Sequence, residues 1–120
     1  MIREFPANHE LIAFFESEPV VLDPDAPWLY NTLDFRTVRS GIEIGCRIVS
    51  SYGEITTRLM RAGQELAKFE LRDAETIRLS MNEHQEVLVA SFAPKLRLDN
   101  FALQLKPRVW VAWGNLHQFP

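Results

Sequence analysis

One segment, Ile42-Glu43-Ile44-Gly45-Cys46-Arg47-Ile48, places an apolar side chain at every second position. Side chains along a strand point to opposite faces in turn, so this spacing predicts a strand with one buried and one wet face. The same spacing recurs in residues 67–71, 77–81 and 101–105. From about residue 32 to residue 113, the pattern therefore predicts one strand after another, joined by tight turns.

We expect a mainly β domain, α+β by strict count, built as an antiparallel meander of about seven to eight strands. Short connections such as Ser40-Gly41 and Ala62-Gly63 have turn chemistry and pair each strand with its sequence neighbour. The sheet is expected to form a sandwich or a curved, partly closed barrel, with one short N-terminal helix packed on it. The predicted strands lie near residues 28–38, 42–49, 54–61, 65–72, 75–81, 86–92, 100–106 and 108–114.

The N-terminal segment predicts one short helix. Asn8 is the expected N-cap, and Leu11, Phe14 and Phe15 then share one helical face. Pro19 is expected to end the helix, which is so short that it needs to dock on the sheet for stability.

The 120 residues have the size of a single domain. We divide it into the N-terminal segment with its helix (1–19), a Pro/Asp loop (20–27), the antiparallel β meander (28–114) and a tail (115–120). Residues 87–90 and 109–113 are apolar on both faces, which a strand needs only when both faces are covered. The cover is expected to be the helix or a partner subunit.

Composition indicates the cellular compartment and the class of partner. A single cysteine cannot form an internal disulfide, which favours a reducing compartment. The chain starts without a signal-peptide pattern and contains no apolar run near the ~20 residues that span a bilayer. A net charge of -3 argues against a nucleic-acid partner. We therefore expect a cytoplasmic protein of bacterial type, with no membrane and no nucleic-acid partner.

The charge is unevenly spread. Residues 1–35 carry one cation and seven acids, a net of -6, while the remainder carries 12 cations and nine acids, a net of +3. The acidic segment is a solvated helix surface, a surface for a basic partner, or a segment that folds back on the basic sheet.

Residues with catalytic chemistry do not form a recognisable pattern. Cys46 is in register with apolar neighbours, so we expect it in the core. His9, His84 and His117 lack a second ligand at metal-binding spacing, and Asp23 lies in a proline-rich turn. We predict no catalytic residue, no metal site and no cofactor.

Aromatic and basic residues are the best candidates for binding. Two aromatics, at 28 and 30, are expected to share a face of an early strand, and two tryptophans, at 110 and 113, to face opposite sides of the last strand. Basic residues near the last two strands either meet an acidic partner or protect an exposed edge. The candidate binding residues are Trp28, Tyr30, Trp110, Trp113, Arg97 and Arg108.

These features favour a small, non-catalytic protein-interaction domain. Immunity proteins, the inhibitory partners in bacterial toxin systems, are similar to it in size and character. The alternative is a β barrel that binds a small ligand, or an enzyme with its site at the sheet mouth. The expected partner is another protein or a second copy of the chain, since the last strands of two copies can pair in a homodimer.

Overall fold

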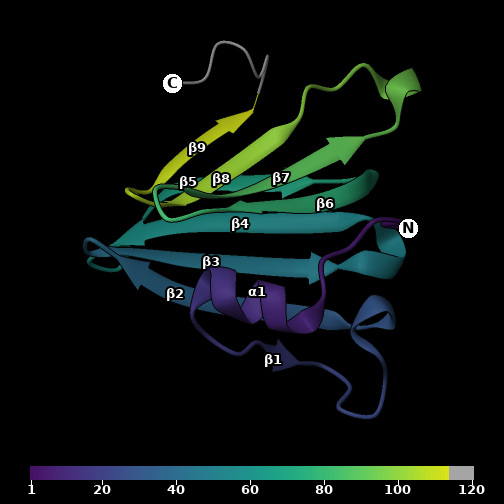
Figure 1. Ribbon diagram of the computed structural model, residues 1–120, viewed down its shortest axis with the longest axis horizontal. Coiled ribbons are helices and arrows are strands. Elements are labelled where there is room, and N and C mark those ends of the chain that lie inside the picture. Colours follow the sequence, from purple (N-terminus) through teal and green to yellow (C-terminus); the bar gives the residue numbers. More distant parts are fainter. Residues whose placement is uncertain (114–120) are drawn as a thin grey trace.

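The computed structural model describes residues 1–113, which form two antiparallel sheets (Figure 1). One sheet has the order β1-β2-β3-β4-β5 and the other β6-β7-β8-β9, so strands pair with their sequence neighbours within each sheet, and the chain changes sheet between β5 and β6. The prediction of a mainly antiparallel meander is confirmed, and its two sheets form a sandwich and no closed barrel among these residues. The strands are β1 (Val20–Val21), β2 (Thr32–Arg39), β3 (Ile42–Val49), β4 (Glu54–Arg61), β5 (Gln64–Leu71), β6 (Ala74–Met81), β7 (Glu86–Phe92), β8 (Phe101–Lys106) and β9 (Trp110–Trp113).

From β3 onwards the strands begin and end within two residues of their predicted bounds. The prediction of a strand from residue 28 was wrong, because Trp28–Tyr30 forms a 3-10 helix, η1. The cause is Asn31, whose side chain donates hydrogen bonds to the carbonyls of Asp23 (2.5 Å) and Ala26 (3.0 Å). The loop is thereby closed just before β2 begins at Thr32. The two-residue β1, which was not predicted, pairs with β2 at the sheet edge.

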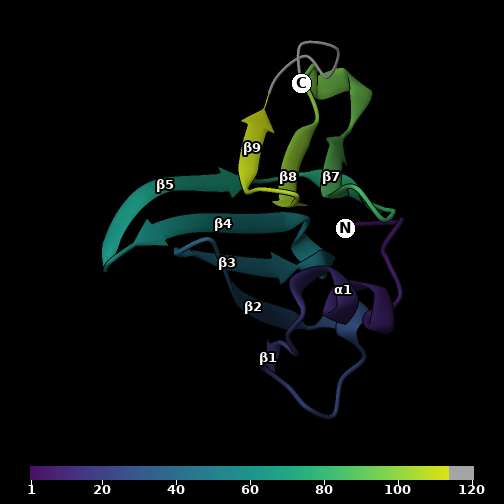
Figure 2. The same cartoon turned by 60° about the vertical axis from the view of Figure 1, so that its left-hand side comes forward.

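The strands of the two sheets run across one another (Figure 2). The sheets meet where β5 leads into β6, and there the Ala74 amide donates to the Gly53 carbonyl (2.9 Å). Gly53 has a φ of 66°, and a Cβ at this position would lie 2.9 Å from the Ala74 carbonyl oxygen. Glycine is thus required here both by the backbone conformation and by the close approach of β6.

The N-terminal segment forms backbone hydrogen bonds both to the turn after β3 and to β6, and so connects the two sheets. The Ile2 amide donates to the carbonyl of Ser50, in the 3-10 helix η2 (Ser50–Tyr52) that follows β3 (2.9 Å). Two residues later the Glu4 carbonyl accepts from the Ile77 amide of β6 (2.9 Å). Ile2 itself is fully buried, so the segment contributes apolar contacts as well as hydrogen bonds.

Helix α1 (Asn8–Phe15) begins one residue away from its expected cap. Ala7 is the N-cap, and its amide donates to the Glu10 carboxylate (2.9 Å). Glu16 has a left-handed φ of 53°, which ends the helix before Pro19 is reached.

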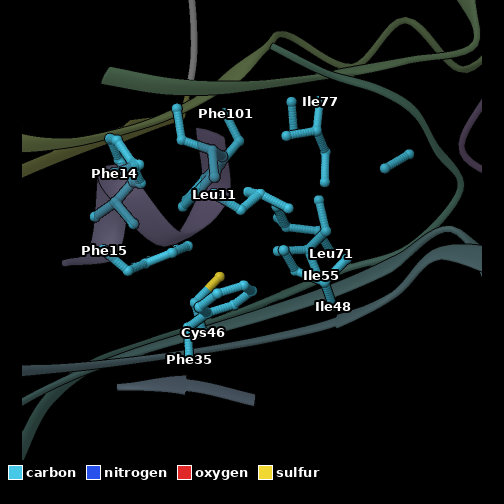
Figure 3. Packing of buried hydrophobic residues seen from close by; sticks show 14 of the residues in the cluster. Leu11, Phe14, Phe15, Phe35, Cys46, Ile48, Ile55, Leu71, Ile77 and Phe101 are labelled. Atoms are coloured by element: carbon cyan, nitrogen blue, oxygen red, sulfur yellow. The ribbon is translucent and has the colours of Figure 1, made fainter. Parts of the chain in front are cut away.

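The apolar face of α1 lies between the two sheets (Figure 3). Leu11, Phe14 and Phe15 are fully buried, as predicted from their spacing. Phe15 stacks on Phe35 of β2, with ring centroids 4.5 Å apart and an interplanar angle of 18°. Phe14 meets the ring of Phe15 edge-on at 4.9 Å. Helix and strand side chains therefore fill the space between the sheets.

Truncating the buried ring of Phe14 tests this packing. We expect Phe14→Ala to lower the free energy of unfolding by about 3 to 5 kcal/mol, because a large cavity would remain between the sheets. The measurement is a urea melt. Val38→Ala is the control, since Val38 is exposed and its truncation should change stability by about 0.5 kcal/mol or less. Equal losses of unfolding free energy for the two substitutions would contradict the packing of the helix between the sheets.

Candidate functional site

The five-stranded sheet turns one face away from the core, and we call it the outer face. Alternation along β2 sends Leu33 and Phe35 into the core and the intervening Asp34 and Arg36 outwards. Val20 and Val38 on the same face are 72% and 62% exposed. The outer face is formed by Val20, Asp34, Arg36, Val38, Glu43, Gly45, Arg47, Thr56, Arg58, Met60, Lys68 and Glu70.

A hollow of about 600 Å³ lies on the outer face and spans β2 to β5. Its floor contains Gly45, which lies opposite Arg36 of β2 on one side and Arg58 of β4 on the other. Lys68 of β5 lies opposite Arg58 and continues the row. The register thus aligns three cations from three strands, interrupted by one residue without a side chain.

Three cations of the outer face, Arg47, Arg58 and Lys68, form ion pairs with neighbouring acids. Arg47 pairs with Asp34 across β2 and β3, with 2.9 Å between Nη2 and Oδ2. Arg58 pairs with Glu65 at 2.8 Å. A hydrogen bond from Lys68, followed by the positive charge of Lys68, lowers the pKa of Glu70. Exposed pairs of this kind contribute little to stability, so their main effect is to orient the charged groups.

A second group of charges joins α1 to both sheets at the opposite end of the helix from Ala7. Lys106 of β8 lies 2.6 Å from the Glu16 carboxylate, and Arg39 of β2 lies 3.5 Å from it. The hydrogen bond from Lys106, then the charge of Arg39, lowers the pKa of Glu16. Lys106 also lies 3.7 Å from Glu86 of β7, and both Arg39 and Glu86 are mostly buried. Glu16 and Lys106 themselves are about half exposed, so this group links helix and sheets at the surface, above the mostly buried Arg39 and Glu86.

Three of the seven acids in residues 1–35 form ion pairs with basic residues of the sheets. Glu4 pairs with Arg78 of β6 (2.9 Å), Glu16 with Lys106, and Asp34 with Arg47. Glu4 and Glu16 thus fold back on the sheets, whereas Asp34 belongs to β2 and pairs with the neighbouring strand. Asp23 instead accepts the amide of Asp25 at 3.1 Å and helps to shape the loop before η1.

The structure separates the early aromatic candidates. Trp28 packs against the core, edge-on to Phe35 with ring centroids 6.1 Å apart. Tyr30, two residues later, is 63% exposed. The 3-10 helix therefore turns one ring inwards and the other outwards, and the expected shared strand face does not form.

The late tryptophans face opposite sides of β9, as predicted. Trp113 lies opposite the core residue Phe101, and its indole N–H donates to the Asp99 carbonyl (2.9 Å). Trp110 lies opposite Gln104, on the other face. It borders a hollow of about 420 Å³ together with Arg108.

Arg97 follows the 3-10 helix η3 (Pro94–Leu96), before β8, and Arg108 follows β8. The six residues predicted from sequence thus lie in separate places: around η1, beside the turn between β8 and β9, and at the other end of β8. Sequence reasoning did not find the outer face. Its signal, arginine on either side of a strand glycine, becomes visible only when the register of β2, β3 and β4 is known.

Neither the models of known protein families nor the curated protein sequences give a match to this chain. Its fold has a solved counterpart. The chain is similar to a chain of the contact-dependent growth inhibition toxin–immunity protein complex from Klebsiella pneumoniae 342. The TM-score is 0.80 at 17% sequence identity, and the match covers 94% of this chain and 96% of that chain. At this identity the likeness shows a shared fold over nearly the whole of both chains.

Cys46 lies in the core, as predicted. Burial raises the pKa of its thiol to about 12, against a weaker opposing effect of the hydrogen bond with Thr57 (3.8 Å). Within residues 1–113, no three His, Cys, Asp or Glu side chains are grouped to hold a metal ion; His117 and the tail 115–120 lie outside the described residues. The described part of the chain has no helix of the length and hydropathy needed to cross a membrane.

The buried thiol gives a prediction about pH. The native thiol keeps its proton up to about pH 12, whereas the unfolded chain releases it above about pH 9. The stabilisation from Cys46 is therefore complete below pH 9 and is lost as the pH rises towards 12. Relative to Cys46→Ala, the wild-type free energy of unfolding should fall by up to about 1.4 kcal/mol per pH unit in this window. Urea melts of both proteins from pH 8 to pH 11 measure this difference. If the free energies of unfolding of both proteins changed equally with pH, the buried, protonated thiol would be contradicted.

Proposed function

We propose that this chain is an immunity-type protein, a non-catalytic binder that neutralises a protein toxin by forming a complex with it. The proposal is carried by the shared fold with a chain of a toxin–immunity protein complex, which extends over 94% of this chain and 96% of the other.

The chemistry of the surface favours the immunity role over the toxin role. The single thiol is buried and holds its proton, so it is a poor nucleophile. In the hollow of the outer face, Arg47, Arg58 and Lys68 are held in ion pairs with neighbouring acids. A rigid surface with oriented charges and exposed valines suits the binding of another protein, because little order has to be gained on association.

We further propose that this binding takes place in the cytoplasm of a bacterium, which the free, buried Cys46 supports. The candidate residues from sequence become secondary contacts in this proposal. Tyr30, Arg97 and Arg108 have exposed side chains, whereas the side chain of Trp28 packs against the core. Trp110 and Trp113 lie at the edge strand β9 and would contact a partner only beside that edge.

Self-association is the second form of protein binding to test. β9 is the terminal strand of its sheet, and a second copy could add its own β9 there. Light scattering over a range of concentrations measures the mass directly. A mass that rises from 13.9 kDa to twice that value would support a homodimer, and a constant monomer mass would exclude it.

The neutralising role is tested in two steps. The purified chain captures partners from a lysate of the source organism, and each captured protein is then expressed in bacterial cells with and without this chain. We expect one captured protein to arrest growth alone and to be harmless when co-expressed. The control is Phe14→Ala, which should lose protection in proportion to its loss of folded protein.

Two results would contradict the proposal. The first is growth arrest that the chain does not relieve. The second is growth arrest by this chain alone, which would assign it to the toxin role instead.

A further inference from the structure

We propose that the hollow over Gly45 is where the partner inserts an acidic segment, with a carboxylate held between Arg36 and Arg58. The inference rests on the proposed function for the identity of the partner as a toxin. The location and the chemistry of the site rest on the sheet itself.

The fold of the free chain does not require a glycine at position 45. Its φ lies outside the left-handed region, and a Cβ added to it would meet nothing within 4 Å. Residues 43 to 47 also keep an unbroken register with both neighbouring strands. Glycine weakens a strand interior, and it often marks a place where a ligand or another chain comes close. The reason for this glycine therefore lies outside the free chain.

The charges around Gly45 define what can approach. Its cross-strand neighbours are Arg36 and Arg58, and its outward neighbours along β3 are Glu43 and Arg47. Three of these four side chains are arginines. A guanidinium group binds a carboxylate through two parallel hydrogen bonds, and arginine is the usual choice for such contacts at interfaces.

Arg36 is the residue that is ready to bind. Arg47 and Arg58 already pair with Asp34 and Glu65, which hold their guanidinium groups in position. Arg36 is exposed, and no described residue forms a hydrogen bond or ion pair with it. A carboxylate from a partner would give it the contact that the free chain lacks.

The row of arginines in this hollow fits a second copy of the chain poorly. In a two-fold dimer centred on Gly45, the same patch meets itself, so the arginines of one copy would face those of the other. Like charges brought together at an interface oppose binding. An acidic segment of a different protein satisfies the charges that a second copy would repel.

A large side chain at position 45 tests the site, because it should affect binding of the partner without affecting folding. Gly45→Phe should leave the urea midpoint unchanged or raise it, because the new side chain enters open space. The affinity for the partner from the growth assay should fall about 100-fold or more, since the ring occupies the seat of the inserted segment. Ser80→Phe is the matched control on an exposed strand position of the other sheet, and it should bind as the wild type does. Wild-type affinity of Gly45→Phe would overturn the assignment while leaving the neutralising function intact.

Reversing the charge tests the chemistry. Arg36→Glu should weaken binding about 10- to 100-fold, with a smaller loss at high salt, and Arg36→Lys should lie between it and the wild type. Lys95→Glu makes the same charge change in the exposed η3 and serves as the control. Equal losses of affinity for Arg36→Glu and Lys95→Glu would show a general effect of charge. That result would overturn a specific carboxylate site at Arg36.

A peptide titration does not depend on the toxin at all. A short peptide rich in aspartate and glutamate, added to the full chain, should shift the NMR signals of Arg36, Gly45 and Arg58, and a lysine-rich peptide of equal length should not. These shifts would support the site even if no captured protein arrests growth. Shifts with the lysine peptide alone, or a dimer that Gly45→Phe splits, would overturn the acidic occupant.

Discussion

The insertion of α1 between the two sheets is the interaction on which this structure depends. The sheets run across one another, so their inner faces cannot cover each other along their whole length (Figure 2). Phe15 stacks on Phe35 of β2, and Phe14 and Leu11 complete a fully buried helix face in the remaining space. A helix of eight residues would not persist alone in water, so helix and sheets stabilise each other.

Polar contacts then fix the position of the helix and of the sheets. The N-terminal strand-like segment bonds to Ser50 and to β6, and Gly53 allows β6 to approach closely. At the other end, Glu16 binds both Arg39 and Lys106 and so links α1 to one strand of each sheet. None of these contacts uses a residue of the hollow on the outer face of β2 to β5, whose charges are oriented by their own ion pairs. Such pre-organisation lowers the entropic cost of binding a partner.

Local pattern predicted the parts of the fold that local physics controls. Alternation located the strands from Ile42 onwards, and helical spacing identified Leu11, Phe14 and Phe15 as the buried face. The start of β2 was missed because the side chain of Asn31 bonds back to the carbonyls of Asp23 and Ala26, a contact that strand spacing does not display.

The site was harder to predict, for a related reason. Arg36, Gly45 and Arg58 are nine and 13 residues apart in sequence and become neighbours only through the register of three strands. Single aromatic residues drew attention instead, yet the fold uses Trp28 in its core and anchors Trp113 to the Asp99 carbonyl. A binding surface on a sheet is a property of aligned rows, which linear spacing does not display.

Hydroxyl-radical footprinting of the chain, alone and in complex with its partner, locates the bound surface. Met60 lines the hollow of the outer face, and Met81 at the end of β6 offers the same chemistry on the other sheet. We expect the partner to protect Met60 and Val38 from oxidation and to leave Met81 as reactive as before. Protection of Met81 or Trp113 with Met60 unchanged would place the partner on the four-stranded sheet and contradict the account.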